Sequence, residues 1–110
     1  MPKAPRELTP HWFHMLLALT DGNRHGQAIM QAVYEQSSGR VTLWPAMLYR
    51  NLDRLIDEGL IVEVKGSAPS AGSPRFFSIT AAGRRACQAE AERLASVVKL
   101  ARAKLLPHRG

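Results

Sequence analysis

The sequence has little cysteine and no long hydrophobic run. Its single cysteine, Cys87, excludes an internal disulfide framework and fits a reducing compartment. No stretch of about 18 apolar residues is present, so we expect no membrane span. Residues 1–10 are polar, carry three prolines and lack the apolar core of a secretion signal. These absences predict a cytoplasmic protein.

Recognisable catalytic and metal-binding motifs are also missing. The glycines do not form a phosphate-binding loop of the G-x-x-x-x-G-K-[ST] type, and no local motif signals a Ser/His/Asp or Cys/His arrangement. His11 and His14 stand three residues apart, but no cysteine or carboxylate cluster accompanies them. His25 and His108 do not complete a ligand spacing. We therefore expect no enzyme, no metal site and no cofactor.

Charge gives a first indication of a partner. Fifteen Lys and Arg residues against nine Asp and Glu give the 110-residue chain a formal charge of +6. A basic chain favours an anionic partner such as nucleic acid. Most of the excess lies in residues 84–110, however, and a basic tail can simply keep a small protein soluble. The placement of individual cations therefore matters more than their sum.

Residues 41–79 carry the most informative pattern. They follow the order short strand (Arg40 to Leu43), helix, strand, loop of small residues and strand, which is the order of a winged helix-turn-helix. The helix begins at Pro45, which suits a first helical position, and Gly59 can end it in a left-handed cap. One face of the helix is apolar, with Leu48, Leu52, Leu55 and Ile56. The other face carries Ala46, Tyr49, Arg50, Asp53, Arg54 and Asp57.

A small residue followed by a tyrosine and two arginines suits insertion of this helix into a DNA major groove. The predicted DNA-contacting residues of the helix are Ala46, Tyr49, Arg50, Asn51 and Arg54. The alternative is a solvated helix face whose charges pair with one another, Arg50 with Asp53 and Arg54 with Glu58. The flanking strands favour the DNA-binding interpretation.

The loop between the last two strands is the candidate wing. Residues 66–73 are all small apart from one proline, which predicts the tip of a hairpin between strands at Ile61 to Lys65 and Arg75 to Ile79. Backbone amides and serine hydroxyls suit phosphate contact, and an ordinary hairpin tip is the alternative. The predicted contacts here are Lys65, Ser67, Ser70, Ser73 and Arg75. His25, at the start of an earlier helix, can present its imidazole to a phosphate or only cap that helix.

The remaining chain divides around this pattern. We expect a flexible arm (1–9), a mainly α winged helix-turn-helix domain with a small β-hairpin (10–80), a long C-terminal dimerisation helix (81–106) and a tail (107–110). The domain begins with a helix opened by Thr9 or Pro10. A second helix runs from His25-Gly26 to residues 37–39, and its predicted buried face contains Ile29, Met30, Val33 and Tyr34.

The last helix has a heptad seam, which is typical of helices that pack at a shallow crossing angle. The seam consists of Cys87, Ala91, Leu94, Val98, Ala101 and Leu105, and Val97 and Leu100 widen it. It can pack on the chain's own first helix, but a helix of about 26 residues spans roughly 39 Å and outruns so small a domain. We therefore predict a homodimer. Trp12, Phe13 and Leu16 of the first helix are predicted to meet the partner's seam.

The sequence resembles the PadR family of bacterial transcriptional regulators. The resemblance runs from about Leu8 to Leu105, and its specific parts are residues 13–19, His25-Gly26, residues 48–61 and residues 75–83. It implies a homodimeric winged-helix repressor, similar to the compact subgroup with one C-terminal helix. In that subgroup some members bind flat apolar or aromatic compounds at the dimer interface. Trp44 departs from the pattern, because a small polar cap is common there.

Two functions follow from these observations. The first is a sequence-specific DNA-binding regulator that represses transcription from a palindromic operator in double-stranded DNA and is released by a small molecule or stress signal. The alternative is a dimeric module that uses the winged fold to bind protein. Affinity for DNA that falls steeply as salt rises distinguishes the first from the second.

Overall fold

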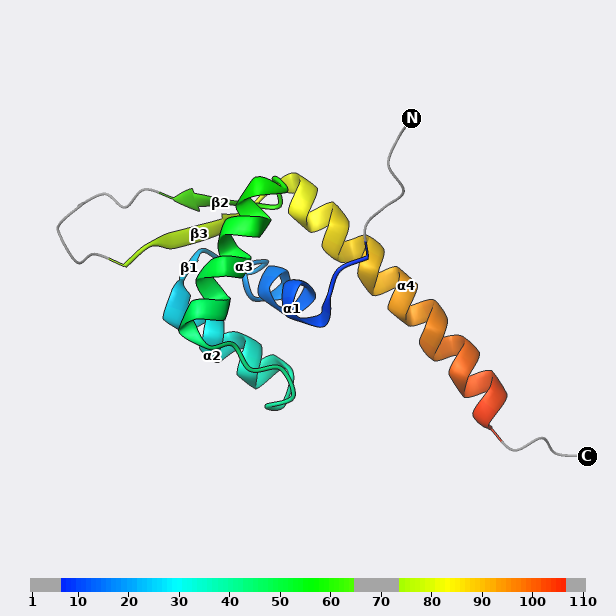
Figure 1. Cartoon of the computed structure of the whole chain (residues 1–110). Helices are drawn as coiled ribbons and strands as arrows, with labels where there is room; N and C mark the ends of the chain where they lie inside the picture. Colours follow the sequence, from blue (N-terminus) through cyan, green and yellow to red (C-terminus); the bar gives the residue numbers. More distant parts are fainter. Residues whose placement is uncertain (1–6, 65–73, 107–110) are drawn as a thin grey trace, which may run out of the picture.

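The helices and strands follow one another as a winged helix with a long last helix (Figure 1). The computed structural model describes residues 7–64 and 74–106. Its elements are α1 (Pro10–Ala18), β1 (Arg24–His25), α2 (Gly26–Gln36), α3 (Pro45–Asp57), β2 (Ile61–Val64), β3 (Phe76–Ile79) and α4 (Ala81–Leu105). The predicted fold class is confirmed. Of the predicted arm, the structure describes residues 7–9 alone. The predicted tail lies outside the described residues.

The helix ends follow from the residues that flank them. Thr9 caps α1 by accepting the Trp12 amide at 3.1 Å, and Pro45 stands at the first position of α3. After α3, Gly59 adopts a left-handed φ of 75°. The Leu60 amide then reaches back to the Leu55 carbonyl at 2.9 Å. This closing bond satisfies a carbonyl of the last turn and turns the chain into β2.

The core lies where the first three helices meet the small sheet. Its fully buried side chains include Met15, Leu16, Leu19, Ile29, Val33, Leu48, Leu52, Leu55, Ile61 and Phe77. The predicted apolar face of α3 is confirmed, because its leucines at positions 48, 52 and 55 are all inside. Tyr34 of α2 was predicted to be buried, and this is wrong, since its side chain is 55% exposed.

The sheet has the antiparallel order β1-β3-β2, and its first strand lies elsewhere than predicted. Residues 40–43 form no strand. Ser38 and Gly39 both have positive φ, and the Ser37 hydroxyl accepts the Val41 amide at 2.9 Å, so this segment turns instead of extending. The first strand is Arg24–His25, immediately before α2, and it pairs with Phe76 and Phe77 of β3.

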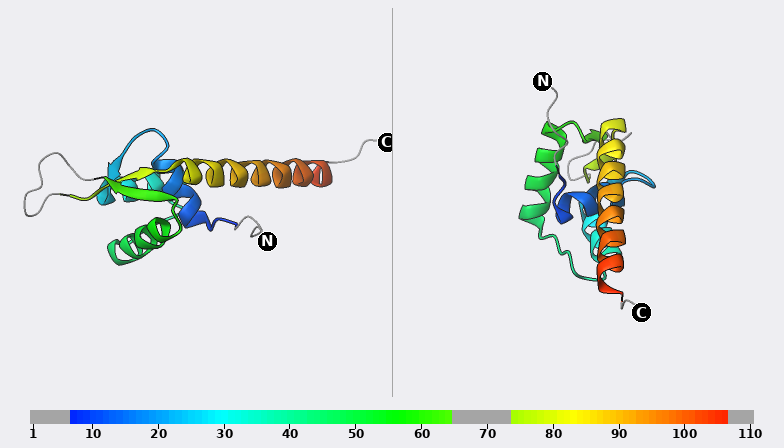
Figure 2. Two further views of the ribbon diagram at one scale, coloured as in Figure 1. Left: turned by 90° about the horizontal axis from the view of Figure 1, so that it is seen from above. Right: turned by 90° about the vertical axis from the view of Figure 1, so that its right-hand side faces the viewer.

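Helix α4 leaves the body of the domain (Figure 2). Its first turns pack beside α1 and bury Gly83, Cys87 and Glu90, and Thr80 caps it by accepting the Gly83 amide at 3.0 Å. The rest of the helix projects away from the other elements. Within the described residues, the helices lack the combination of length and apolar character that crossing a membrane requires.

Candidate nucleic-acid interface

The outer face of α3 is exposed along its whole length. Ala46, Tyr49, Arg50, Asp53 and Arg54 are all exposed, whereas the leucines on the opposite side are buried. This division follows from the 3.6-residue period, because the apolar face fixes the helix on the core and turns the polar face outward. The helix therefore presents the residues that the sequence predicts for DNA contact, apart from Asn51.

The two arginines of α3 are uncommitted. In the part of the chain that the structure describes, neither Arg50 nor Arg54 has an ion-pair partner. The pairing of Arg50 with Asp53, part of the alternative interpretation, is not formed, since the Asp53 carboxylate faces Arg75 across 3.9 Å. Both guanidinium groups thus keep their donors for another acceptor, which phosphate oxygens and base edges supply.

Arg75 connects the wing to α3. Its guanidinium binds the Glu63 carboxylate of β2 at 2.8 Å and lies 5.9 Å from the centre of the Tyr49 ring. It also stacks over Phe77 at 5.2 Å. The hydrogen bond with Glu63 raises the pKa of Arg75 above its ordinary value. Arg75 is half-exposed, so any phosphate that it contacts competes with the Glu63 carboxylate.

Tyr49 is positioned by a close approach between α2 and α3. Gly26, at the start of α2, lies under its ring, and a Cβ at position 26 would come within 2.7 Å of the Tyr49 hydroxyl oxygen. His25 caps α2 by accepting the Ala28 amide on Nδ1 at 3.2 Å, and its ring meets Phe76 edge-on. The imidazole therefore has a structural role, and its contact with DNA stays a prediction.

Asn51 was assigned to the DNA-contacting set, and the structure corrects this. Its side-chain oxygen accepts the indole N–H of Trp12 at 2.9 Å, and its side-chain nitrogen donates to the Met47 carbonyl at 2.8 Å. Both ends of the amide are thus used inside the protomer. The division of α3 into an apolar face and a polar face did not reveal this, because Asn51 lies at the border between the two.

The other predicted wing residues, Lys65, Ser67, Ser70 and Ser73, lie outside the described residues. The strands on either side of them are antiparallel, with Val64 opposite Phe76. Strand β2 packs against α3, and β3 lies next to it in the sheet (Figure 1).

The predicted dimer surface needs three corrections. Leu16 is fully buried and Cys87 is 5% exposed, so both belong to the protomer's own core and have no surface to offer a partner. Trp12 is 9% exposed and is held under α3 by Asn51. Burial raises the pKa of the Cys87 thiol, which favours the unreactive protonated form. The packing of α4 on the chain's own α1 therefore accounts for the start of the seam.

Beyond Glu90 the seam is open. Its larger apolar side chains remain in water, with Leu94, Val97, Val98, Leu100 and Leu105 all exposed. Ala91 is exposed as well, whereas Ala101 and, on α1, Phe13 are half-buried. These residues form the surface that stays available to a second copy.

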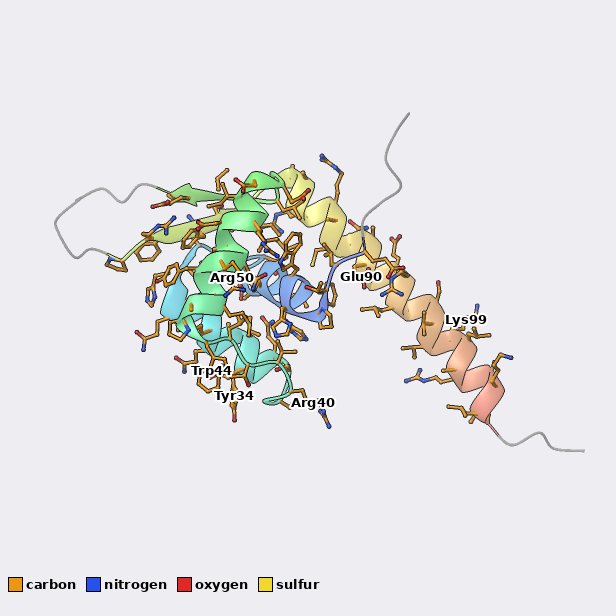
Figure 3. All side chains as sticks on the ribbon, in the orientation of Figure 1. Tyr34, Arg40, Trp44, Arg50, Glu90 and Lys99 are labelled. Atoms are coloured by element: carbon orange, nitrogen blue, oxygen red, sulfur yellow. The ribbon has the colours of Figure 1, made fainter. Side chains whose placement is uncertain are left out.

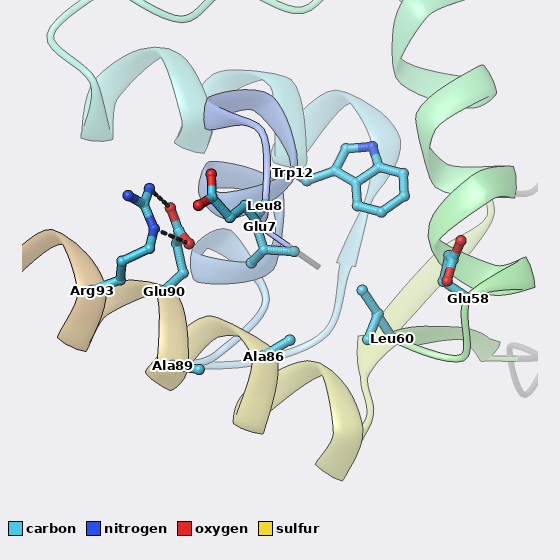
Figure 4. A pocket seen from close by; sticks show the side chains of 9 residues that line it. All are labelled: Glu7, Leu8, Trp12, Glu58, Leu60, Ala86, Ala89, Glu90 and Arg93. Atoms are coloured by element: carbon cyan, nitrogen blue, oxygen red, sulfur yellow. Dashed lines mark hydrogen bonds and ion pairs between the residues drawn. The ribbon is translucent and has the colours of Figure 1, made fainter. Parts of the chain in front are cut away.

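A cavity of about 240 Å³ lies between the start of α1, the end of α3 and the first turns of α4 (Figure 4). Leu8, Trp12 and Leu60 give it an apolar lining. At one side the Arg93 Nε donates to the Glu90 carboxylate at 3.0 Å, and a second bond joins the same two side chains. No sequence pattern predicted this cavity, because its lining comes from segments that lie far apart in the chain.

Trp44, at the N-cap of α3, was also missed as a candidate contact. Its side chain is 66% exposed and makes no capping hydrogen bond. Figure 3 labels it at the first turn of α3, with Tyr34 on α2 and Arg40 in the turn between the two helices. The signal was its position in front of Pro45, where a small polar residue would cap the helix.

Comparison with known proteins identifies this arrangement. The model of the transcriptional regulator PadR-like family matches residues 15–89. A PadR family transcription regulator from Clostridium difficile is similar in structure, with a TM-score of 0.73 and 15% identity over 89% of this chain and 100% of that one. A transcriptional regulator from Clostridium thermocellum has a TM-score of 0.72 and 18% identity over 86% and 92%.

A third similar structure is RosR of H. salinarum, with a TM-score of 0.62 and 22% identity over 93% of this chain and all of that one. At these identities the similar structures support the fold alone. A search of curated proteins found no match.

Proposed function

Because the chain belongs to the PadR-like family of transcriptional regulators, we propose that it binds a palindromic operator in double-stranded DNA as a homodimer and represses transcription there. The observation that carries the proposal is the exposed face of α3, with Arg50 and Arg54 free of ion pairs within the described residues. A helix that enters the major groove reads bases with the side chains of this face. The proposal includes a location in the cytoplasm, where the regulator would meet its operator.

Dimerisation completes the binding surface. A palindromic site presents two half-sites about one duplex turn, roughly 34 Å, apart, and one protomer has one α3. The open part of the α4 seam, from Leu94 to Leu105, supports pairing, because exposed leucines and valines at heptad spacing gain free energy when a second helix covers them. The half-buried Phe13 of α1 is the remaining candidate on the partner's side.

The cavity beside Trp12 supports release by a small molecule. It touches the end of α3 through Glu58 and Leu60 and the start of α4 through Ala86 and Ala89. A compound that binds there contacts both the DNA-reading helix and the helix proposed to join the protomers. Its mainly apolar lining suits an apolar compound. Such a ligand weakens DNA binding if it binds more tightly to the DNA-free arrangement of these helices than to the DNA-bound arrangement.

A mobility-shift assay tests the proposal. Duplexes selected from a random pool by the full-length protein are compared with unselected duplexes over a salt series. A DNA-binding regulator prefers the selected duplexes and loses affinity steeply as salt rises, through counterion release. Weak binding that does not distinguish the two pools would favour the protein-binding module instead. Transcription in vitro from a promoter that carries the selected site then distinguishes repression, a fall in transcript, from activation.

A further inference from the structure

Trp44 is the most exposed large aromatic side chain among the described residues, and its place is unusual. It occupies the N-cap of α3, where it makes no capping hydrogen bond, and 66% of its surface faces solvent. Trp12, the other tryptophan, is buried and has its indole N–H bonded. A side chain this large and apolar gains free energy when a partner covers it, and tryptophan is enriched at interfaces for this reason.

Further aromatic and cationic side chains are exposed in the segment that precedes Trp44. Tyr34 is exposed on α2, and Arg40 is exposed in the turn that joins α2 to α3 (Figure 3). Within the described residues, Arg40 has no ion-pair partner, and the first turn of α3 contains no acidic residue. The positive charge in the segment before α3 therefore suits an anionic partner better than an apolar protein surface.

We infer that the Trp44 indole contacts thymine methyl groups in the major groove. The inference rests on the proposed function and adds a specificity-determining residue to it. A recognition helix meets the base edges with its amino-terminal residues, and Trp44 stands at that end, just before Ala46 and Tyr49. The 5-methyl group of thymine is the apolar feature of a base edge, and apolar side chains contact it. Arg40, in the turn before α3, and Arg50, on α3, are exposed and can bind neighbouring phosphates.

Deoxyuridine tests this directly, because it differs from thymidine by the loss of that methyl group alone. In the duplexes selected by the full-length protein, each thymine is replaced by uracil in turn and the Kd is measured. At one thymine or two neighbouring thymines per half-site, we expect affinity to fall about fourfold, the factor that corresponds to burial of one methyl group. Trp44→Ser should bind the thymine and uracil duplexes equally.

Tyr34→Ser is the matched control, since it removes another exposed aromatic side chain, on α2 and outside the recognition helix. It should keep the wild-type preference for thymine over uracil. Circular dichroism establishes that both variants are folded. Because Trp12 is buried, acrylamide quenching of the fluorescence reports mainly on Trp44, and it should decrease when the selected duplex binds.

The outcomes separate the inference from the proposed function. If no duplex is selected over the random pool, both are wrong. If a duplex is selected but uracil has no effect at any position, or Trp44→Ser keeps the thymine preference, the inference alone is wrong. Continued quenching of Trp44 in the DNA complex would also overturn it and would leave this surface for a protein partner.

Discussion

Gly83 of α4 lies so close to the backbone carbonyl of Leu60 that a side chain at position 83 would overlap the oxygen. Thr80, the N-cap of α4, also donates its amide to the Leu60 oxygen at 3.0 Å and its hydroxyl to the Gly59 oxygen at 2.7 Å. Gly59 and Leu60 form the turn that ends α3. The helix proposed to join the protomers therefore starts on the end of the helix proposed to read DNA, and their directions are coupled.

Gly83→Ala should destabilise the protein by about 1–3 kcal/mol, because the added methyl group must push α4 away from the Leu60 backbone. Thermal unfolding measures the effect. Ala81→Ser, an exposed change two residues away, is the control and should melt like the wild type. An unchanged Tm in Gly83→Ala would mean that α4 is not seated tightly on this turn.

Asn51→Ala should lower the free energy of unfolding by about 1–3 kcal/mol, because it leaves the buried Trp12 indole N–H without its acceptor. DNA affinity per folded molecule should remain that of the wild type. Denaturant unfolding and a titration with the selected duplex measure the two quantities. The opposite result, full stability with weakened DNA binding, would return Asn51 to the set of DNA contacts.

Features that rest on a repeating pattern could be predicted from the sequence. The alternation of leucines with Tyr49 and Arg50 on α3 predicted which face is buried, since every turn repeats the signal. Residues 24–25 were missed as a strand because two residues are too few for an alternating pattern, and their partner, β3, is about fifty positions away. Leu16 was assigned to the interface because the wide apolar stripe of α1 does not tell which part faces the chain's own core.

The Glu90–Arg93 pair should make stability depend on pH. The hydrogen bond from Arg93 lowers the pKa of the Glu90 carboxyl below its ordinary value of 4.5. A lowered folded-state pKa means that the pair stabilises the protein above pH 4.5 and that this stabilisation is lost as pH falls through the lowered value. Glu90→Gln should therefore reduce the Tm at pH 7.

The Tm difference between the wild type and Glu90→Gln should shrink as the pH is lowered below 4.5. Thermal unfolding between about pH 3 and pH 7 measures it, within the range over which carboxyl groups titrate. Glu92→Gln, an exposed carboxylate on the same helix, should show a much smaller difference at pH 7. A Glu90→Gln difference that stays constant over the whole range would show that the ion pair does not contribute to stability.

Leu94→Glu and Val98→Glu should separate the protomers, because each places an unpaired carboxylate in the middle of the proposed interface. Both side chains are exposed in the protomer, so the separated chain should keep its fold. DNA affinity should fall with the loss of the dimer. Sedimentation measures the mass, and Ser96→Glu, an exposed position between the two, is the control. Intact dimers of both variants would move the interface elsewhere.

The central claim is that the exposed face of α3 reads DNA, and alanine variants of Tyr49, Arg50 and Arg54 test it most directly. Arg85→Ala is the control, because it removes the same charge as the arginine variants from an exposed position on α4. The measurement is the Kd for the selected duplex at fixed salt. Arg50→Ala should lose about 1–3 kcal/mol of specific binding if it reads a base edge, with a relaxed preference at one base pair. Arg85→Ala should lose much less. Wild-type affinity in all three α3 variants would contradict the account.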